Sequence, residues 1–447
     1  MTIYRATVLD TPGALGDRDG LRAEEDCALV VHDGVVVDRT DFTTARTAHP
    51  QDDVVDLREG LLLPGMVDTH VHFPQVRVIG GLGMTLLEWL RECALPEEGR
   101  LADTEYARGV ARDFLQGLRR SGTTTALVFG SHFEGAVDTL FTEAEAAGLR
   151  ITSGLVMSDR ILREELLQTP DEAFAAGQRL AERWHGRGRL RYAVTPRFSL
   201  STSDEMLRAC GELLAEGGDG PAGRRWFTSH VNENVDEIAE VARLFPDAAH
   251  YVDTYARHGL VTDRSVLAHD VHPTAAELEV LGAAGAAVAH CPSSNSALGS
   301  GLFPLGAHLE AGVQVALGSD VGAGVGFCLL KEGLQAYFVQ QLRGPDGVPL
   351  AASDLLHLAT RSGALALGMG DEVGDLSPGK QFDALWLRPP AHGLLATGLR
   401  HAKDATDALA KIFALGSPAD IAAVWIGGQE TTDVRPEPVG VTTPKEA

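Results

Sequence analysis

The first β-rich run after residue 60 reads Leu61-Leu-Leu-Pro-Gly-Met-Val-Asp-Thr-His-Val-His72. Seven similar runs follow it, and longer stretches rich in Ala, Leu, Glu and Arg with helical spacing separate the runs. This alternation is typical of βαβ units and of a parallel sheet. Eight such strands predict an α/β fold, a closed TIM-like (β/α)8 barrel over residues 61–374. The later runs are Thr123–Ser131, Arg150–Ser158, Leu190–Phe198, Arg225–Glu233, Ser265–His272, Ala286–Asn295 and Gln314–Val321.

Both ends of the chain carry short β-like segments separated by turn residues. Neither end alone has enough strands for a stable sheet. We therefore expect residues 1–60 and 375–447 to combine into one small β-sandwich domain beside the barrel, with a disordered Pro/Thr/Lys-rich tail after Thr431. The segments are Tyr4–Val8, Cys27–Val31, Gly34–Asp38, Val54–Asp56, Phe382–Leu387 and Ala422–Ile426.

The composition limits the kinds of partner that the chain can bind. Its 447 residues include 62 Asp and Glu against 38 Lys and Arg, which gives a formal net charge of −24. Nucleic acids and anionic membranes are bound through clustered Lys and Arg, and no basic tract is present, so we expect neither partner. No apolar stretch approaches the ~20 residues of a membrane-spanning helix, and no signal peptide is evident. Five scattered cysteines fit reduced thiols, and these features together predict a cytoplasmic protein.

Histidines and one carboxylate close four of the predicted barrel strands. His70 and His72 end the first run, and His230 lies near the end of the fifth. His269 lies at the sixth strand end and Asp320 at the eighth, and active sites of such barrels lie at these C-terminal ends. Strand residues two apart point to the same face, so both imidazoles of the His-x-His pair would face the barrel axis. Alone, that pair would be structural about as often as metal-binding, but the other strand ends favour a divalent transition-metal site made of His70, His72, His230 and Asp320.

A metal site with an open position lowers the pKa of bound water toward neutrality, and the reaction then needs groups that carry protons. Glu233, three residues after His230, is one candidate. Its alternative role is a carboxylate at a helix N-terminus, favoured there by the helix dipole. His269 is a second candidate, which would orient or deprotonate the water together with Asp320. The alternative for His269 is a buried histidine hydrogen-bonded to the backbone.

With these residues the chain resembles the metal-dependent amidohydrolase superfamily. The likeness rests on Pro64-Gly-Met-Val-Asp-Thr-His-Val-His72, on His230 and His269, and on Gly318-Ser-Asp320. Several members bridge two metals with a lysine at the end of the fourth strand, whereas this strand reads Val194-Thr-Pro-Arg-Phe198. An always-protonated guanidinium cannot take that role, so we expect a mononuclear site, as in the deaminase branch.

Further motifs are similar to those of the guanine deaminases, and they cover nearly the whole chain. The discriminating stretches are the Arg-Phe-Ser-Leu run that begins at Arg197 and the His-x-x-Glu-Asn run that begins at His230. The other stretches are His72-Phe-Pro-Gln75, Leu86-Leu-Glu-Trp-Leu90, His290-Cys-Pro-Ser-Ser-Asn-Ser296 and Gly318-Ser-Asp-Val321. This resemblance implies hydrolytic deamination of guanine to xanthine and ammonia, in purine catabolism, by a homodimer.

The resemblance also implies a role for each candidate residue. One zinc ion per subunit, with Fe²⁺ as the alternative metal, would be held by His70, His72, His230 and Asp320. Catalysis would use Glu233, His269 and Asp320. The small-molecule purine would be bound by Gln75, Arg197, Phe198 and Trp89. An amide and a guanidinium suit the carbonyl and ring-nitrogen edge of a neutral purine, and an aromatic ring suits its face. The alternatives are loop anchors for Gln75 and Arg197 and core packing for Phe198 and Trp89.

Two other functions stay open at this point. One is a deaminase or chlorohydrolase for a related heterocycle, such as an oxidised purine, a pterin or a triazine. The other is a catalytically dead barrel that serves as a binding scaffold. One departure from the family pattern is Asp270, which follows His269 at a position where a small residue is common. A carboxylate there would favour the charged form of His269 and alter the pH profile.

Overall fold

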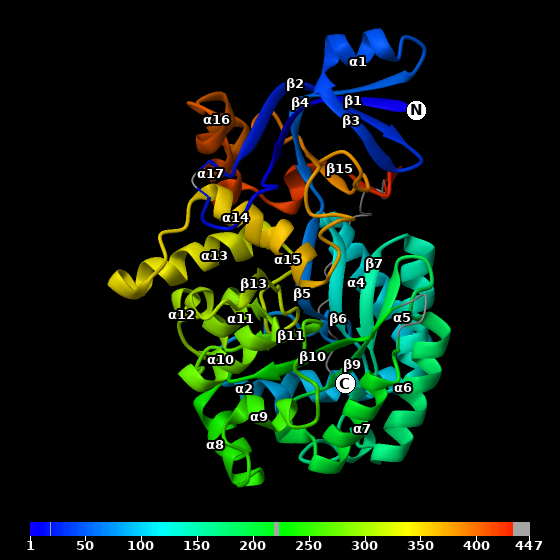
Figure 1. Ribbon diagram of the computed structural model, residues 1–447, viewed down its shortest axis with the longest axis vertical. Coiled ribbons are helices and arrows are strands. Elements are labelled where there is room, and N and C mark those ends of the chain that lie inside the picture. Colours follow the sequence, from blue (N-terminus) through cyan, green and yellow to red (C-terminus); the bar gives the residue numbers. More distant parts are fainter. Residues whose placement is uncertain (18, 219–222, 432–447) are drawn as a thin grey trace, which may run out of the picture.

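The computed structural model describes residues 1–17, 19–218 and 223–431. Figure 1 shows a barrel surrounded by helices, with a separate sheet above it that contains the N-terminal strands. The barrel strands pair in the parallel order expected for a (β/α)8 fold, which confirms that prediction. They are β5 (Met66–His72), β6 (Thr123–Phe129), β7 (Arg150–Gly154), β9 (Leu190–Pro196), β10 (Trp226–Val231), β11 (Ser265–His269), β12 (Ala287–His290) and β13 (Gln314–Leu317), with β8 (Val156–Met157) paired to β9.

The barrel closes where its first and last strands meet. The Thr69 hydroxyl on β5 donates to the Leu317 carbonyl at 2.8 Å. Beyond β13, the Asp320 amide donates to the His70 carbonyl and the His72 amide donates to the Val321 carbonyl, both at 2.8 Å. These bonds join the ends of β5 and β13, so the residues that follow each strand face one shared opening.

All eight barrel strands are shorter than the runs predicted for them, and the first and seventh differ most. In the first run, residues 61–64 belong to β4 (Asp53–Pro64) of the other sheet, and only Gly65 separates it from β5. A Cβ at Gly65 would lie 2.3 Å from the Thr124 hydroxyl, so the close approach of the two segments requires glycine. In the seventh run, β12 ends at His290 and helix α11 (Pro292–Ala297) follows, because proline at the first turn favours a helix start.

The terminal segments form one seven-stranded sheet, which confirms that both ends of the chain build a small β unit. Hydrogen bonds join its strands in the order β16-β15-β14-β4-β1-β2-β3, so the described residues form a single sheet where we expected a sandwich. Tyr4 stacks on Phe382 with ring centroids 4.3 Å apart and so joins the two chain ends. The strands not yet given are β1 (Thr2–Asp10), β2 (Arg22–His32), β3 (Val35–Asp41), β14 (Ala384–Leu387), β15 (Ile421–Ile426) and β16 (Gln429–Glu430).

Parts of the domain prediction go beyond what the described residues test. The boundaries at 60/61 and 374/375 stay a prediction, and the expected disordered tail after Thr431 lies outside the described residues. The segment after residue 375 also contains helices α16 (Leu394–Arg400) and α17 (Ala405–Leu415), which the sequence pattern did not predict. Buried apolar residues of α17 such as Ile412 and Phe413 hold it against the neighbouring helices.

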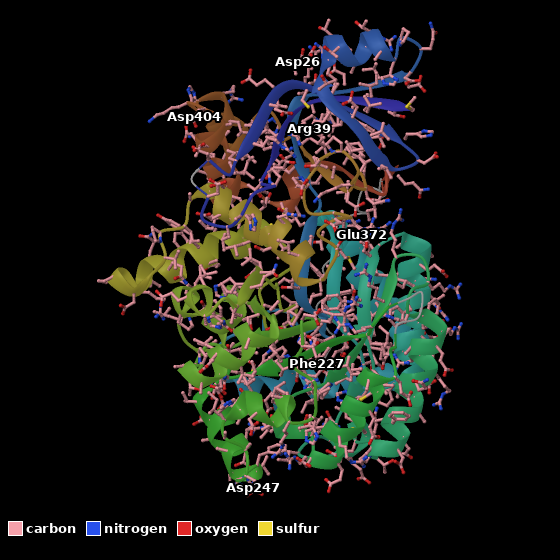
Figure 2. All side chains as sticks on the ribbon, viewed as in Figure 1. Asp26, Arg39, Phe227, Asp247, Glu372 and Asp404 are labelled. Atoms are coloured by element: carbon pink, nitrogen blue, oxygen red, sulfur yellow. The ribbon has the colours of Figure 1, made fainter. Side chains whose placement is uncertain are left out.

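Charged contacts support both parts of the structure. In the terminal sheet, Arg39, labelled in Figure 2, pairs with Asp10 at 2.9 Å and with Glu24 at 2.7 Å. Glu372, labelled near the junction of the two parts, pairs with Arg191 at 2.7 Å and with Arg150 at 3.4 Å. Arg150 lies on barrel strand β7 and also pairs at 3.0 Å with Asp383, which directly precedes β14 of the terminal sheet, so this contact ties the two parts together.

Several helices around the barrel begin at residues that cap their N-termini, and their apolar residues are spaced to pack on the barrel. Asp103 caps α4 (Thr104–Arg120) by accepting from the Glu105 amide, and Ser203 caps α7 (Asp204–Ala215) by accepting from the Met206 amide. No helix in the described ranges combines the length and the apolar character needed to cross a membrane. The other helices of four or more residues are α1 (Phe42–Ala48), α2 (Leu86–Trp89), α3 (Leu95–Gly99), α5 (Glu134–Ala147), α6 (Pro170–Trp184), α8 (Val235–Leu244), α9 (Tyr251–Ala256), α10 (Ala275–Ala284), α12 (Leu305–Glu310), α13 (Leu329–Leu342), α14 (Ala352–Ala359) and α15 (Arg361–Ala366).

Candidate active site

Four ligand-type side chains converge at the C-terminal ends of the barrel strands. The Nε2 atom of His72 lies 3.1 Å from Nε2 of His70 and 3.2 Å from Nε2 of His230. The Oδ1 atom of Asp320 lies 3.3 Å from Nε2 of His70 and 3.2 Å from Nε2 of His72. All four side chains are buried. The structure therefore brings together the four residues that the sequence suggested as metal ligands.

The protonation of these imidazoles shows what the cluster can hold. Nδ1 of His230 lies 2.6 Å from the Arg197 carbonyl, which can only accept, so Nδ1 carries the proton and Nε2 presents a lone pair. Burial lowers the pKa of His70 to about 3, and burial with the neighbouring histidines holds the pKa of His230 well below its usual value. Neutral imidazoles whose lone pairs meet at about 3 Å cannot all find hydrogen bonds. A divalent cation satisfies them, and a histidine and carboxylate set is one that such ions prefer.

The carboxylate of Asp320 is held in its charged form. Burial would raise the pKa of Asp320, but hydrogen bonds with His70 and His72 hold the pKa well below the usual value. Its second oxygen, Oδ2, accepts from the Ser294 hydroxyl at 2.5 Å. Asp320 therefore presents one oxygen to the histidine cluster and keeps the other in a fixed orientation.

Glu233 lies beside the cluster and is suited to carry a proton. Its carboxyl group is buried, and this burial, with the charges of Asp320 and Glu237, raises the pKa of Glu233 well above its usual value. Helix α8 is capped by the next residue, Asn234, so Glu233 precedes the helix and does not serve as a first-turn carboxylate. The carboxylate of Glu237 accepts from the Glu233 amide at 3.1 Å and so holds this loop in place.

His269 faces both acidic groups. Its Nε2 lies 3.6 Å from Oε2 of Glu233 and 3.9 Å from Oδ2 of Asp320. Its Nδ1 lies 2.9 Å from Oδ1 of Asn295, so Nδ1 donates and Nε2 is left as an acceptor. A neutral histidine oriented in this way can accept a proton from a water molecule between these groups.

A pocket opens over these residues at the mouth of the barrel. Gln75, Arg197, Phe198 and Trp89, the residues proposed to bind a purine, all line it. Its other walls are formed by His72, Leu86, Leu90, His230, Glu233, His269, Leu298, Asp320 and Ala323. The candidate substrate residues and the candidate proton carriers therefore line one pocket.

The backbone is unusual where the strands end at this cavity. Asn232, His269, Asp270 and Asp320 have φ values of +48°, +74°, +43° and +48°. Residues other than glycine rarely adopt this left-handed conformation, and its cost is accepted mainly at functional sites. The turns aim the side chains of Glu233, His269 and Asp320 into the barrel mouth.

A model of the amidohydrolase family matches residues 61–431. A curated relative from Deinococcus radiodurans, named as a probable guanine deaminase, is 58% identical over 434 residues, covering 96% of this chain and 98% of the relative. The chain belongs to the guanine deaminase group of the amidohydrolase family. Among solved structures, the E. coli guanine deaminase superposes on this amidohydrolase with a TM-score of 0.92 at 36% identity, covering 96% of this chain and 99% of that one. A guanine deaminase from C. acetobutylicum, solved with guanine bound in its active site, gives a TM-score of 0.87 at 26% identity over 96% and 99% of the two chains.

Several residues that contact the site side chains of this amidohydrolase were not predicted from the sequence. Ser294 and Asn295, which hold Asp320 and His269, lie in the stretch from His290 to Ser296 that the family resemblance had already marked, so a signal was present. Glu98 is different. It lies on α3 outside every strand end, and only the charge of Arg197 indicated that some acidic partner must exist.

Asp270, the residue that departs from the family pattern, has partners of its own. Its Oδ2 lies 2.9 Å from Nε2 of the buried His308, and its Oδ1 accepts from the Asn232 side chain at 2.8 Å. Through Asn232 it links the end of β10, which precedes Glu233, to the end of β11, which carries His269. Its effect on the pH profile stays a prediction, but its structural contacts connect the two strand ends that lead to Glu233 and carry His269.

We expect the Asp270→Ala variant to lose about 3 kcal/mol of unfolding free energy, because two buried donors lose their acceptor. Urea unfolding followed by circular dichroism measures this difference. The matched control is Asp113→Ala, whose half-exposed carboxylate pairs with Arg77 at 2.7 Å and whose loss is expected to cost less than about 1 kcal/mol. Equal urea midpoints for Asp270→Ala and the parent chain would show that the link contributes nothing.

Proposed function

We propose that this amidohydrolase is a zinc-dependent enzyme that hydrolyses guanine to xanthine and ammonia. The observation that carries the proposal is the meeting, in one pocket, of a histidine and carboxylate cluster, a buried Glu233 with a raised pKa, and a polar pair formed by Gln75 and Arg197. The naming of close relatives as guanine deaminases supports the same substrate.

The metal would be held by His70, His72, His230 and Asp320, one ion per subunit. Zinc suits three neutral imidazoles and one carboxylate, and Fe²⁺ is the alternative ion for the same donors. A divalent metal bound there would lower the pKa of a water molecule and so make a nucleophile available at neutral pH. Arg197 stands where a bridging lysine would be needed for a second metal, which supports a mononuclear site.

The proton transfers are assigned to three side chains. His269 Nε2 and the Asp320 carboxylate accept the proton of the attacking water, whose oxygen forms a bond to C2 of the base. Glu233 donates its proton to a ring nitrogen beside C2, then takes up the proton of the new C2 hydroxyl and passes it to the exocyclic amine, and the proton held by His269 and Asp320 returns to Glu233. The C2–N bond to that amine then breaks and ammonia leaves. The raised pKa of Glu233 supports this role, since the acid must enter the reaction protonated.

Binding of the base is assigned to the cavity wall. Phe198 and Trp89 offer aromatic surfaces to the face of a planar ring, and Gln75 with Arg197 offers hydrogen bonds to its edge. One placed arginine is sufficient for a neutral base, which agrees with the absence of any basic tract in a chain of net charge −24.

The enzyme is further proposed to be a cytoplasmic homodimer. The five cysteines of the chain are free thiols in the structure, which fits a reducing compartment. On and beside α13, Phe338, Leu342 and Leu302 are 45%, 73% and 41% exposed. The side chain of Arg343 donates to the Leu302 carbonyl at 2.8 Å and so brings these apolar groups together. A subunit contact over this patch would remove them from water.

The decisive assay measures ammonia and xanthine released from guanine, with metal analysis of the same purified sample. The expected result is one ammonia per xanthine and about one zinc or iron per chain. Activity on a pterin or triazine with none on guanine would replace the proposed substrate. A metal-free chain inactive on every heterocycle would favour the scaffold.

A further inference from the structure

We propose that Glu98 is a positioning residue that sets the hydrogen-bonding polarity of the substrate cavity, so that it selects a base with an N–H group next to a carbonyl. This inference rests on the proposed function, and it adds the reason why one purine edge is preferred over another. Glu98 belongs to none of the ligand or proton-carrying groups described above.

Glu98 bridges the two residues assigned to the edge of the base. It lies on α3 and is only 3% exposed. Its Oε1 accepts from the Gln75 side-chain amide at 2.7 Å, and its Oε2 accepts from Nη1 of Arg197 at 2.6 Å. One buried carboxylate therefore engages both polar side chains that line the cavity wall.

The charge state of Glu98 makes it an acceptor only. Burial would raise the pKa of Glu98, but the Arg197 guanidinium and the nearby His132 hold the pKa below its usual value. The ring nitrogen Nδ1 of His132 lies 3.5 Å from Oε2, and burial lowers the pKa of His132 to about 4. Both hydrogen bonds of Glu98 come from N–H donors, one of them on the always-charged guanidinium of Arg197, so Glu98 acts as an acceptor in the structure.

A carboxylate that only accepts fixes the orientation of the side chains that donate to it. It can accept but not donate, so Gln75 must turn its NH₂ group toward Glu98 and its carbonyl oxygen away from it. In agreement, the Gly322 amide lies 3.3 Å from Oε1 of Gln75 on that other side. The oxygen has a second lone pair for a ligand. Arg197 has five N–H donors, of which Glu98 uses Nη1, so the guanidinium remains a donor toward the cavity.

The result is an acceptor from Gln75 next to a donor from Arg197. Guanine presents the matching pattern, since its N1–H is a donor and the adjacent C6 carbonyl is an acceptor. A purine with an amino group at C6 presents the reverse pattern, with a bare ring nitrogen next to an N–H donor. Glu98 therefore favours binding of the first kind of base. With the second kind, the Gln75 acceptor would face a ring-nitrogen acceptor and the Arg197 donor would face an N–H donor, which weakens binding.

The test uses Glu98→Gln with two purines that cannot be deaminated at C2. Hypoxanthine carries the N–H and carbonyl edge, and adenine carries the reversed edge. Each is measured as a competitive inhibitor of guanine deamination. In the parent enzyme hypoxanthine is expected to bind more tightly than adenine. In Glu98→Gln the neutral amide lets Gln75 turn over, so the inhibition constant for hypoxanthine is expected to rise about 10- to 100-fold while that for adenine stays within about threefold.

Glu97→Gln is the matched control, because this neighbouring buried carboxylate contacts Arg100 at 3.0 Å and the Tyr106 hydroxyl instead. It should keep the parent ratio of the two inhibition constants. Metal content and melting temperature verify that Glu98→Gln is folded. A general structural defect would weaken both inhibitors alike, so an unchanged ratio in folded Glu98→Gln overturns the proposal.

A second variant covers the case in which Glu98→Gln does not fold. Glu98→Asp keeps an acceptor-only group but is one methylene shorter, so it cannot reach both partners. It should still prefer hypoxanthine, with an inhibition constant raised about tenfold and little change for adenine. A ratio equal to that of the parent enzyme would refute the proposal here too. Failure of the parent enzyme to deaminate guanine would count against the proposed function instead.

Discussion

Glu233→Gln is expected to remain folded and loaded with metal while kcat falls by about 10²- to 10⁴-fold. The amide has the shape of the acid but cannot donate the proton that the ring nitrogen needs. The carboxyl group is buried, and its raised pKa favours the protonated form that this role needs, while no water-exposed acid is at hand to replace it. Release of ammonia under saturating guanine measures kcat, and mass spectrometry of the same sample measures the metal.

The matched control for this variant is Glu240→Gln on α8. Glu240 is a surface carboxylate that pairs with Arg243 at 2.5 Å, outside the cavity, and its loss is expected to leave kcat within about twofold. Should Glu233→Gln turn over guanine at the parent rate, Glu233 would have no part in proton transfer. A variant without metal would show instead that Glu233 supports the metal site.

His230→Ala is expected to lose metal and activity together. The imidazole presents its Nε2 lone pair to the cluster because Nδ1 is committed to the Arg197 carbonyl at 2.6 Å. Without it, a four-donor set becomes a three-donor set, and we expect less than about a tenth of the parent metal content after dialysis and at least about 10³-fold lower kcat/KM. Metal per chain is measured after dialysis against a weak chelator.

His185→Ala controls for the loss of a half-buried histidine outside the site. His185 ends α6 and binds the Tyr192 amide at 2.9 Å through Nδ1, far from the cluster. This variant is expected to retain the parent metal content, whatever its cost in stability. A fully metal-loaded His230→Ala protein would mean that the ligand set proposed for this site is wrong.

Much of the barrel could be predicted because its physical signals are local. Short apolar runs alternating with amphipathic helices are visible in the sequence, and they recur where β6, β9, β10 and β11 lie in the structure. The residues at which strands and helices begin and end were harder to predict. The join between β4 and β5 depends on the contact of Gly65 with Thr124, and α11 begins directly after β12, so neither boundary shows in periodicity alone.

The site was predictable where position along a strand determines direction. His70 and His72 share one face of β5, and the parallel order of the strands brings His230 and Asp320 to the same mouth. The supporting contacts were not predictable in the same way. Glu98 lies on a helix and contacts Arg197, which is 99 positions later in the chain. His308 contacts Asp270, which is 38 positions earlier. Such pairings depend on tertiary packing.

The single residue between β4 and β5 has a consequence for how the protein unfolds. β4 lies in the middle of the terminal sheet, paired with β1 and β14, and β5 begins two positions after it and carries His70. The sheet cannot open far without pulling on the strand that holds the first ligand. A cation that binds only the native site would therefore stabilise the two chain ends as well as the barrel. The two parts should then melt as one cooperative unit, at a temperature that rises with the concentration of free metal.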